Sequence, residues 1–176
     1  MDIRTLVKVT SRAWSLDILA LMHAGTLGRQ SSLLFASSAG RTALTQSLNH
    51  LVDIGLIQRN PGHGHPLRPE FCLTPQGAEI AIFADKIKKA VSNPSEQLLL
   101  RRAWSIPVLI VSQKPRYFTD IRNELVSITD RALSQSLKQL EAQHWLLRKI
   151  DPDIRPTRPL YQATNVGAHI SQAINL

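Results

Sequence analysis

The amino-acid sequence contains one pattern twice, once in each half of the chain. Residues 12–15 and 102–105 both read RAWS, a shift of 90 positions. Residues 43–51 (ALTQSLNHL) match residues 132–140 (ALSQSLKQL) at a shift of 89. Matches in separate blocks that keep their order indicate an internal duplication rather than chance similarity. The chain is therefore expected to fold as two units of the same kind.

The boundary between the copies is expected at Asn93-Pro94. Asn is a favoured N-cap residue, and Pro is favoured at the first position of a helix. This boundary gives a first domain at residues 1–92 and a second domain at residues 93–176. Each copy needs ~70 residues, which is enough for a small domain with its own core.

The chain is strongly basic, and the charge is shared between the copies. It has 21 Lys and Arg against 13 Asp and Glu, a formal net charge of +8. Residues 1–90 carry 10 basic and 6 acidic residues, and residues 91–176 carry 11 and 7, so each part has a net charge of +4. Such a charge suits a polyanionic partner, either nucleic acid or an anionic membrane surface, although it also fits a merely basic soluble protein.

Several classes of protein are not expected from this sequence. The single cysteine, Cys72, excludes an internal disulfide and a four-cysteine zinc site. No stretch has the ~18 consecutive apolar residues of a membrane span, and the first residues lack the apolar run of a signal peptide. We therefore expect a cytoplasmic, nucleoid-associated protein that does not bind membranes.

Motifs of enzymes and of metal sites are also lacking. The sequence has no phosphate-binding glycine loop, no nucleophile elbow and no His/Glu metal pair at helical spacing. His63 and His65 could bind a metal, but zinc needs three or four ligands and no Cys or acidic residue lies within four residues of them in the sequence. We expect neither an enzyme nor a cofactor or metal.

Each copy is predicted to contain helices followed by a β-hairpin and a closing helix. In the first copy, apolar spacing and capping residues predict helices at 2–12, 15–24, 30–37 and 40–53, strands at 56–59 and 70–74, and a last helix at 75–91, with Ser15 as an N-cap. In the second copy, Thr129 is expected to cap the helix that ends near 142, and strands are expected at 146–150 and 160–164. Three helices and a hairpin form a winged helix-turn-helix. The predicted fold class is mainly α with small β-hairpins (α+β), with two tandem winged helix-turn-helix domains.

Both copies carry the same residue types at matching positions. In the first copy these are Trp14, Leu44-Thr45, Leu48, Leu51, Gly55-Leu56, Arg59, Pro66, Phe71, Leu73-Thr74 and Gly77. In the second copy these are Trp104, Leu133-Ser134, Leu137, Leu140, Arg148, Pro156, Tyr161, Thr164 and Gly167. This pattern resembles the HxlR-type winged-helix regulators of bacterial transcription, in which a Trp opens a core helix, L-T-x-x-L-x-x-L-x-x-x-G-L forms the recognition helix, and R…P…(Y/F)-x-L-T-x-x-G forms the wing.

The resemblance implies that the chain binds double-stranded DNA and regulates transcription. Members of that family typically have one domain per chain and pair as homodimers through their outer helices. Two domains in one chain would then form a covalent pseudo-dimer that is monomeric on DNA, while further self-association stays open. Only the second copy has the family's Arg-aromatic element, at 116–125, and it has His144-Trp145 in place of Gly-Leu. The redox-sensing cysteine that many members carry near the N-terminus is missing, so no thiol switch is expected.

The outward faces of the two recognition helices are the candidate base-reading surfaces. Leu44, Leu48 and Leu51 should face the core at ~100° per residue, which turns other side chains outward. The outward set is Thr42, Thr45, Gln46, Asn49 and His50 in the first copy, and Arg131, Ser134, Gln135, Lys138 and Gln139 in the second. Arg, Gln, Asn and hydroxyl side chains are the types that bind base edges or phosphates. The alternative is an ordinary solvated helix face.

The wings add positively charged and histidine side chains that suit contacts with the DNA backbone. They are Arg59, His63, His65 and Arg68 in the first copy, and Arg148, Lys149, Arg155 and Arg158 in the second. Side chains at a hairpin tip typically bind phosphates or the minor groove and do not read the sequence.

The main hypothesis is a sequence-specific transcriptional regulator that places helices 40–53 and 129–142 in the major groove. The alternative is a tandem winged-helix scaffold for protein interaction or chromosome architecture, with weak or non-specific DNA binding.

Overall fold

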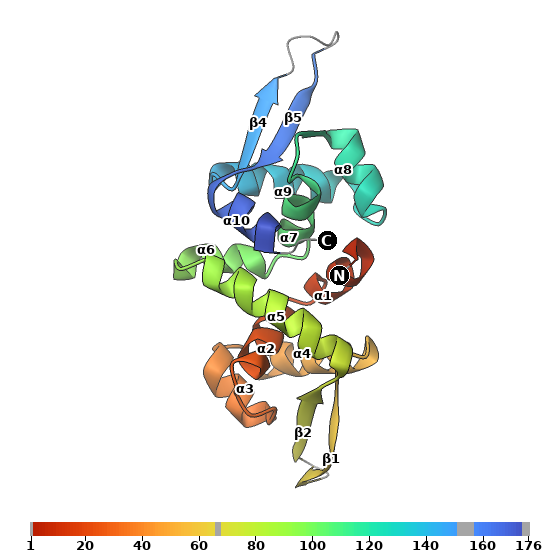
Figure 1. Cartoon of the computed structure of the whole chain (residues 1–176), viewed down its shortest axis with the longest axis vertical. Coiled ribbons are helices and arrows are strands. Elements are labelled where there is room, and N and C mark those ends of the chain that lie inside the picture. Colours follow the sequence, from red (N-terminus) through yellow and green to blue (C-terminus); the bar gives the residue numbers. More distant parts are fainter. Residues whose placement is uncertain (1, 66–67, 151–156, 174–176) are drawn as a thin grey trace. The chain divides into compact units, whose positions relative to one another are not determined.

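The computed structural model describes residues 2–65, 68–150 and 157–173, and the chain forms two compact units (Figure 1). Residues 8–89 make up the first unit, and residues 1–7 together with 90–176 make up the second unit. The division falls within α1 (Ile3–Thr10). Each unit has its own arrangement of helices and a β-hairpin, which positions the candidate DNA-binding residues.

The first unit follows the predicted order of elements. It contains α2 (Ser15–His23), α3 (Gln30–Ser37), α4 (Arg41–Asp53), β1 (Ile57–His65), β2 (Arg68–Leu73) and α5 (Pro75–Ala90). Helix α2 packs against α3 and α4, and Leu44, Leu48 and Leu51 of α4 are buried. The Nζ atom of Lys88 in α5 lies 2.5 Å from the buried carboxylate of Asp17 in α2, which ties the closing helix to the core.

The second unit repeats this order after a further helix, α6, and with one additional strand. It contains α6 (Pro94–Leu100), α7 (Ser105–Val111), β3 (Arg116–Tyr117), α8 (Phe118–Leu125), α9 (Asp130–Ala142), β4 (Leu146–Ile150), β5 (Pro159–Ala163) and α10 (Asn165–Ala173). Helix α7 packs against α8, α9 and α10. The predicted fold class, mainly α with small hairpins and a winged helix-turn-helix in each unit, is confirmed.

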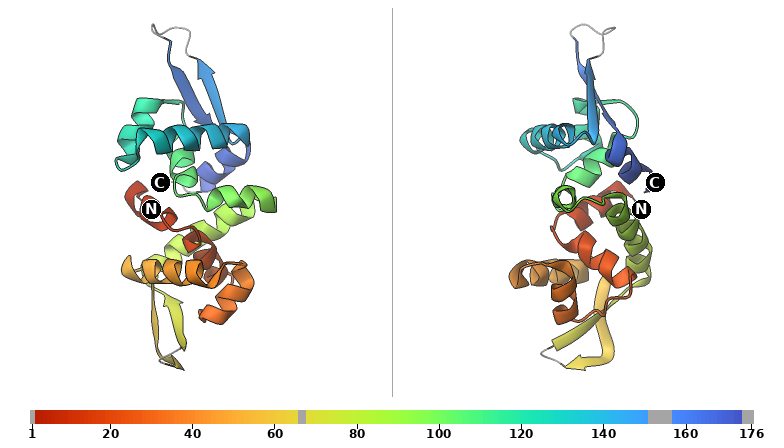
Figure 2. Two further views of the ribbon diagram at one scale, coloured as in Figure 1. Left: turned by 180° about the vertical axis from the view of Figure 1, so that it is seen from behind. Right: turned by 90° about the vertical axis from the view of Figure 1, so that its left-hand side faces the viewer.

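The hairpin of the first unit is longer than its sequence suggests. Strand β1 continues to His65, through a segment whose Gly and Pro residues predict a loop, and pairs antiparallel with β2. The pairing shifts register between Arg59 and Gly64, so the strand contains a bulge or irregularity there. A bulge lets a ladder continue past residues that do not fit a regular strand. Figure 2 shows both hairpins projecting from the helices of their own units.

The third strand of the second unit was not predicted. Residues Arg116 and Tyr117 of β3 pair with Tyr161 and Leu160 of β5, which gives the strand order β3-β5-β4. The first unit has an isolated bridge at the same place, between Arg29 and Glu70. Strands of one or two residues are too short to show a periodic sequence pattern.

The prediction that Ser15 caps the second helix is wrong. The N-cap of α2 is Trp14, and Ser15 is the buried first residue of the helix. The second unit repeats this arrangement with Trp104 and Ser105 at the start of α7. The RAWS repeat therefore marks the same helix start in both units.

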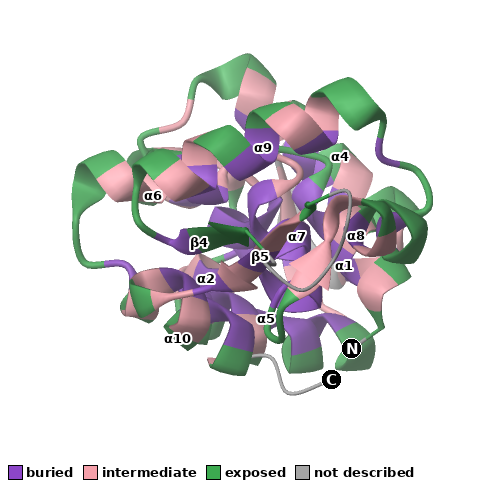
Figure 3. Ribbon diagram, turned by 90° about the horizontal axis from the view of Figure 1, so that it is seen from above, coloured by how far each residue is buried: buried purple, intermediate pink, exposed green. Residues whose placement is uncertain are grey.

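The amphipathic character of the helices is visible when the ribbon is coloured by burial. Figure 3 shows buried residues along one side of α9 and exposed or intermediate residues along the other. Among the described residues, no helix is both long enough and apolar enough to cross a membrane.

Candidate nucleic-acid interface

Helix α9 presents the predicted polar surface of the second unit. Its buried side contains Leu133, Leu137 and Leu140, as the spacing predicts. On the other side Arg131, Gln135 and Lys138 are exposed, whereas Ser134 and Gln139 are half-buried. No carboxylate occurs among these five outward residues, and two of them, Arg131 and Lys138, carry a positive charge that attracts a polyanion.

The start of α9 is held by local contacts that fix its first turn. Thr129 is the N-cap, as predicted, and its Oγ1 accepts a hydrogen bond from the Ala132 N–H at 3.2 Å. The Nε atom of Arg122 in α8 lies 2.5 Å from the Asp130 carboxylate. The contact with Asp130 joins the two helices of the helix-turn-helix and places Arg122 beside the recognition helix. The sequence did not identify Arg122 as a candidate.

The wing of the second unit places its basic residues on different sides. Arg148 and Lys149 are both exposed neighbours in β4, and successive strand side chains point to opposite faces. Arg148 borders a hollow together with Ser134 and Lys138, so it lies on the side of α9. Lys149 is therefore directed away from α9. The sequence could not separate Arg148 from Lys149, because only the structure shows which face of the hairpin lies on the side of the helix.

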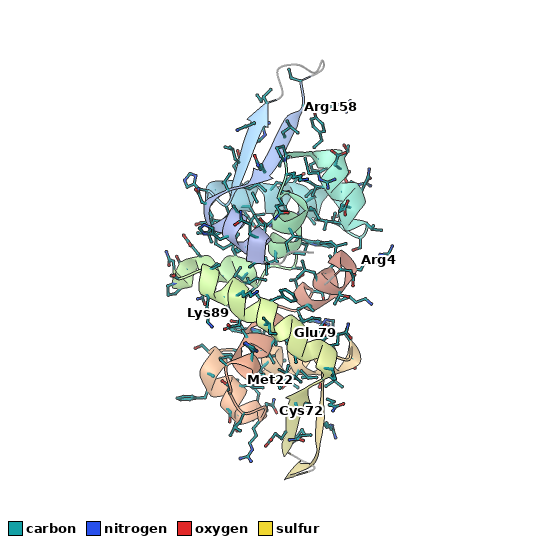
Figure 4. The ribbon with its side chains drawn as sticks, in the orientation of Figure 1. Arg4, Met22, Cys72, Glu79, Lys89 and Arg158 are labelled. Atoms are coloured by element: carbon teal, nitrogen blue, oxygen red, sulfur yellow. The ribbon has the colours of Figure 1, made fainter. Side chains whose placement is uncertain are left out.

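Arg158 lies directly before β5 and is exposed (Figure 4). Its position at the end of the hairpin remote from the helices fits a contact with the DNA backbone. Arg155, the other predicted residue of this wing, lies outside the described residues.

On the outward face of helix α4, some side chains form hydrogen bonds within the first unit. Thr42, Gln46 and Asn49 are exposed, but Thr45 is half-buried and hydrogen-bonded. Its Oγ1 donates to the Arg41 carbonyl at 2.9 Å and accepts from Gln30 Nε2 at 2.6 Å. The sequence did not single out Gln30, because a polar residue at a helix start carries no signal for its tertiary partner.

His50 also has partners within the first unit. Its Nε2 lies 2.8 Å from the Lys8 carbonyl oxygen and 3.2 Å from Ser11 Oγ. The half-buried ring therefore connects α4 to the end of α1. Gln139, at the corresponding position of α9, has no hydrogen bond to another described side chain.

The first wing is described only in part. Arg59 is exposed in β1 and lies opposite Phe71 in the strand pairing. The backbone positions of His63, His65 and Arg68 belong to β1 and β2, but their side chains lie outside the described part of the structure. Nearer the helices, Arg29 Nε is 2.8 Å from the Glu70 carboxylate, and this ion pair joins the start of α3 to β2.

Within the described ranges, no group of three or more His, Cys, Asp or Glu residues could hold a metal ion. Cys72 is half-buried in β2 (Figure 4). The candidate interface thus consists of two polar helix faces and two wings, and among the candidate side chains that the structure describes, the second unit has more exposed basic ones.

Comparison with known proteins assigns both halves of the chain to the same family. A family model described as HxlR-like helix-turn-helix matches the chain twice, over residues 9–97 and 99–176. A solved structure, the reduced form of the transcriptional regulator YodB from B. subtilis, is similar to this chain. It shares 23% sequence identity over 47% of this chain and 83% of its own, with a TM-score of 0.41. A search of curated proteins finds no match. The two matches of the family model span nearly the whole chain, which therefore belongs to the HxlR-like helix-turn-helix family of DNA-binding transcription regulators and contains the family's domain twice.

Proposed function

We propose that the chain is a sequence-specific regulator that binds double-stranded DNA with both of its winged-helix domains, residues 1–92 and 93–176. The observation that carries this proposal is the pair of polar outward faces on α4 and α9, whose candidate base-reading residues include no carboxylate. In this arrangement α4 and α9 enter the major groove, and the two wings contact the flanking backbone. One chain would supply both half-site readers that a homodimer supplies in single-domain relatives.

The two units differ in the chemistry that they offer to DNA. The second unit has Arg131 and Lys138 on its recognition helix, where the first unit has Thr42 and Asn49. Arg binds guanine through two hydrogen bonds, and each such pair contributes about 1–3 kcal/mol of discrimination. The second unit is therefore proposed to supply most of the charge-dependent binding and the stronger base discrimination.

The proposal is tested by selecting bound sequences from a random DNA pool at physiological salt. Enrichment of a defined motif is the expected result. Arg131→Ala should relax the preference at one position of that motif. Arg158→Ala should weaken binding to all sequences and reduce the salt slope by about 1. Lys86→Gln on α5, outside both recognition helices and wings, is the charge-matched control and should change neither the motif nor the affinity.

An architectural or protein-interaction scaffold is the second candidate. It is favoured by Phe35 on α3, whose side chain is 93% exposed, and by the exposed Leu27. Exposed apolar side chains mark a surface that binds other proteins when they form a contiguous patch. If the DNA pool gives salt-sensitive retention without an enriched motif, the scaffold is correct and sequence-specific regulation is not.

A further inference from the structure

The second unit contains a hollow beside its recognition helix. It has a volume of about 270 Å³ and lies between α9, the first residue of α8 and the β4–β5 hairpin. Phe118, Leu137 and Tyr161 provide its apolar and aromatic wall, and Leu137 and Tyr161 are themselves buried. A volume of this size, with aromatic walls, suits a ligand of roughly 10–15 non-hydrogen atoms.

Polar side chains from α9 and β4 complete the lining. They are Ser134, Lys138, Glu141 and Arg148. Lys138 and Arg148 form no ion pair with any residue in the described part of the chain. Two unpaired cations beside an aromatic wall favour a planar ligand with an anionic group. Glu141 can accept a hydrogen bond from a hydroxyl or amino group on the same ligand.

The first unit serves as an internal reference, because several of its equivalent positions carry different residues. Gln30 and Phe118 are the first residues of α3 and α8, and Thr45 and Ser134 are the fifth residues of α4 and α9. In the first unit the Gln30 amide reaches across to Thr45 at 2.6 Å. In the second unit no such link joins Phe118 to Ser134, and the space beside them is open.

Two of the three charged residues of the lining are also absent from the first unit, whereas the third, Arg148, has Arg59 as its counterpart. Asn49 and Val52 stand at the positions of Lys138 and Glu141 in the alignment of α4 with α9. The duplication has therefore kept the helix framework, Leu137 and Arg148, and changed Phe118, Ser134, Lys138 and Glu141 relative to the first unit. Such a difference is expected if only one of the two units binds a ligand.

We propose that this hollow binds a small aromatic carboxylate that carries a hydroxyl or amino group, and that the ligand competes with DNA. Its carboxylate would contact Lys138 and Arg148, its ring would lie against Phe118 and Tyr161, and its donor would reach Glu141. The competition rests on the proposed function, since Ser134, Lys138 and Arg148 are also candidate DNA contacts. The ligand neutralises two cations and covers part of the recognition face.

Binding is tested first without DNA. The full chain is titrated with 4-hydroxybenzoate at constant ionic strength, while NMR follows the backbone amide resonances and calorimetry measures the heat of binding. We expect saturable binding with a Kd of about 1 mM or tighter, with shifts centred on residues 134–141 and 148. The methyl ester, which lacks the charge, should bind at least about tenfold more weakly. Absence of saturation, or equal binding of the ester, would overturn the proposal.

The decisive variant transfers the polar pair of the first unit into the second. Phe118→Gln combined with Ser134→Thr keeps the net charge, and the same two residues already pack together at Gln30 and Thr45. This double variant should reduce affinity at least about tenfold, and Lys138→Gln should reduce it about fivefold. Lys149→Gln removes the same charge on the other side of β4 and should change the affinity for 4-hydroxybenzoate by less than about twofold. An equal effect of Lys138→Gln and Lys149→Gln would overturn the site, because it would mean that only overall charge matters.

Two further measurements separate the ligand from DNA itself. Inorganic phosphate at the same concentration should not saturate the hollow; if it does so as well as 4-hydroxybenzoate, the site is a phosphate subsite and the aromatic assignment is wrong. Saturating 4-hydroxybenzoate should lower the affinity for the selected DNA motif about tenfold, and unchanged DNA affinity would overturn the competition. If the chain selects no motif, the proposed function fails, whereas the titration without DNA still decides whether the hollow binds its ligand.

Discussion

At the scale of single residues, two glycines allow the closing helix of each unit to lie directly against the wing. A Cβ atom on Gly77 would lie 1.8 Å from the Leu56 carbonyl oxygen, and one on Gly167 would lie 2.0 Å from that of Trp145. In the same contacts the Thr74 N–H donates to the Leu56 carbonyl at 3.0 Å, and the Thr164 N–H donates to the Trp145 carbonyl at 2.9 Å. The T-x-x-G pattern at the start of α5 is thus required by backbone packing.

Replacing either glycine by alanine should destabilise its unit strongly. The added methyl group collides with backbone rather than with a flexible side chain, so Gly167→Ala should lower the free energy of unfolding by about 3 kcal/mol. Chemical denaturation of the full chain measures the effect. Gly40→Ser, where a Cβ meets nothing within 4 Å, is the control and should change stability by less than about 0.5 kcal/mol. Equal stability of the Gly167→Ala variant and the unmodified protein would contradict this account.

The turn after each recognition helix places a residue in the left-handed region. In the first unit that residue is Gly55, with φ of 73°, and in the second unit it is His144, with φ of 57°. A side chain is disfavoured in this conformation because its Cβ approaches the backbone. The histidine is tolerated because the surrounding packing and the bonds to its carbonyl oxygen hold the turn.

His144→Gly should therefore stabilise the second unit. We expect a gain of about 0.5–1 kcal/mol, since relief of the backbone strain exceeds the added flexibility of the unfolded chain. Thermal or chemical denaturation detects this gain. The same substitution at the exposed helical residue His169 should instead lower stability by about 1 kcal/mol. If both variants lost stability equally, the left-handed turn would not be a source of strain.

At the scale of secondary-structure elements, the recognition helices begin differently. Helix α9 begins with a Thr129 cap, whereas α4 begins with Gly40, which has no side chain to accept a bond. The Arg122–Asp130 ion pair adds a second link at the start of α9, but both side chains are mostly exposed, so it contributes little. The cap is the stronger local determinant of where α9 starts.

Removing the cap with Thr129→Ala should cost about 1 kcal/mol of stability. Increased amide hydrogen exchange is expected in the first turn of α9, because the Ala132 N–H loses its partner. Thr119→Ala, at an exposed position in the first turn of α8, is the matched control and should change stability by less than about 0.5 kcal/mol. No difference between the two variants in exchange at Ala132 would show that the cap does not stabilise the helix start.

At the scale of the whole molecule, the duplication supplies two recognition helices that are not identical. Gln46 and Gln135 are the same residue at equivalent places, but Thr42 corresponds to Arg131 and Asn49 corresponds to Lys138. A homodimer must present the same side chains to both half-sites, whereas a fused chain can present different ones. We therefore expect an asymmetric binding site.

The selected DNA motif should have two unlike half-sites, with the guanine preference stronger in one of them. Replacing Arg131 by Thr and Lys138 by Asn gives α9 the corresponding residues of α4 and should make the selected motif more symmetric while lowering its salt dependence. Repeating the selection with this double variant measures the change. Selection of a perfect palindrome by the unmodified chain would contradict the expected division of roles.

The sequence by itself determined the duplication, the order of the elements and the buried stripe of each recognition helix. These features are local, because the 3.6-residue period, the cap at Thr129 and the glycine after α4 act within a few residues along the chain. The same local patterns placed the Thr42 and Arg131 faces on the surface. The order of three helices and a hairpin in each copy predicted the winged-helix arrangement that the structure confirms.

Only the tertiary structure decided which distant side chains meet. The Gln30–Thr45 bond, the contact of His50 with Lys8, and the hollow beside Phe118 each join residues from separate elements. The same holds for the strand β3 and for the continuation of β1 to His65. Such contacts depend on how packed elements approach in space, and a sequence pattern with a short period contains no information on that approach.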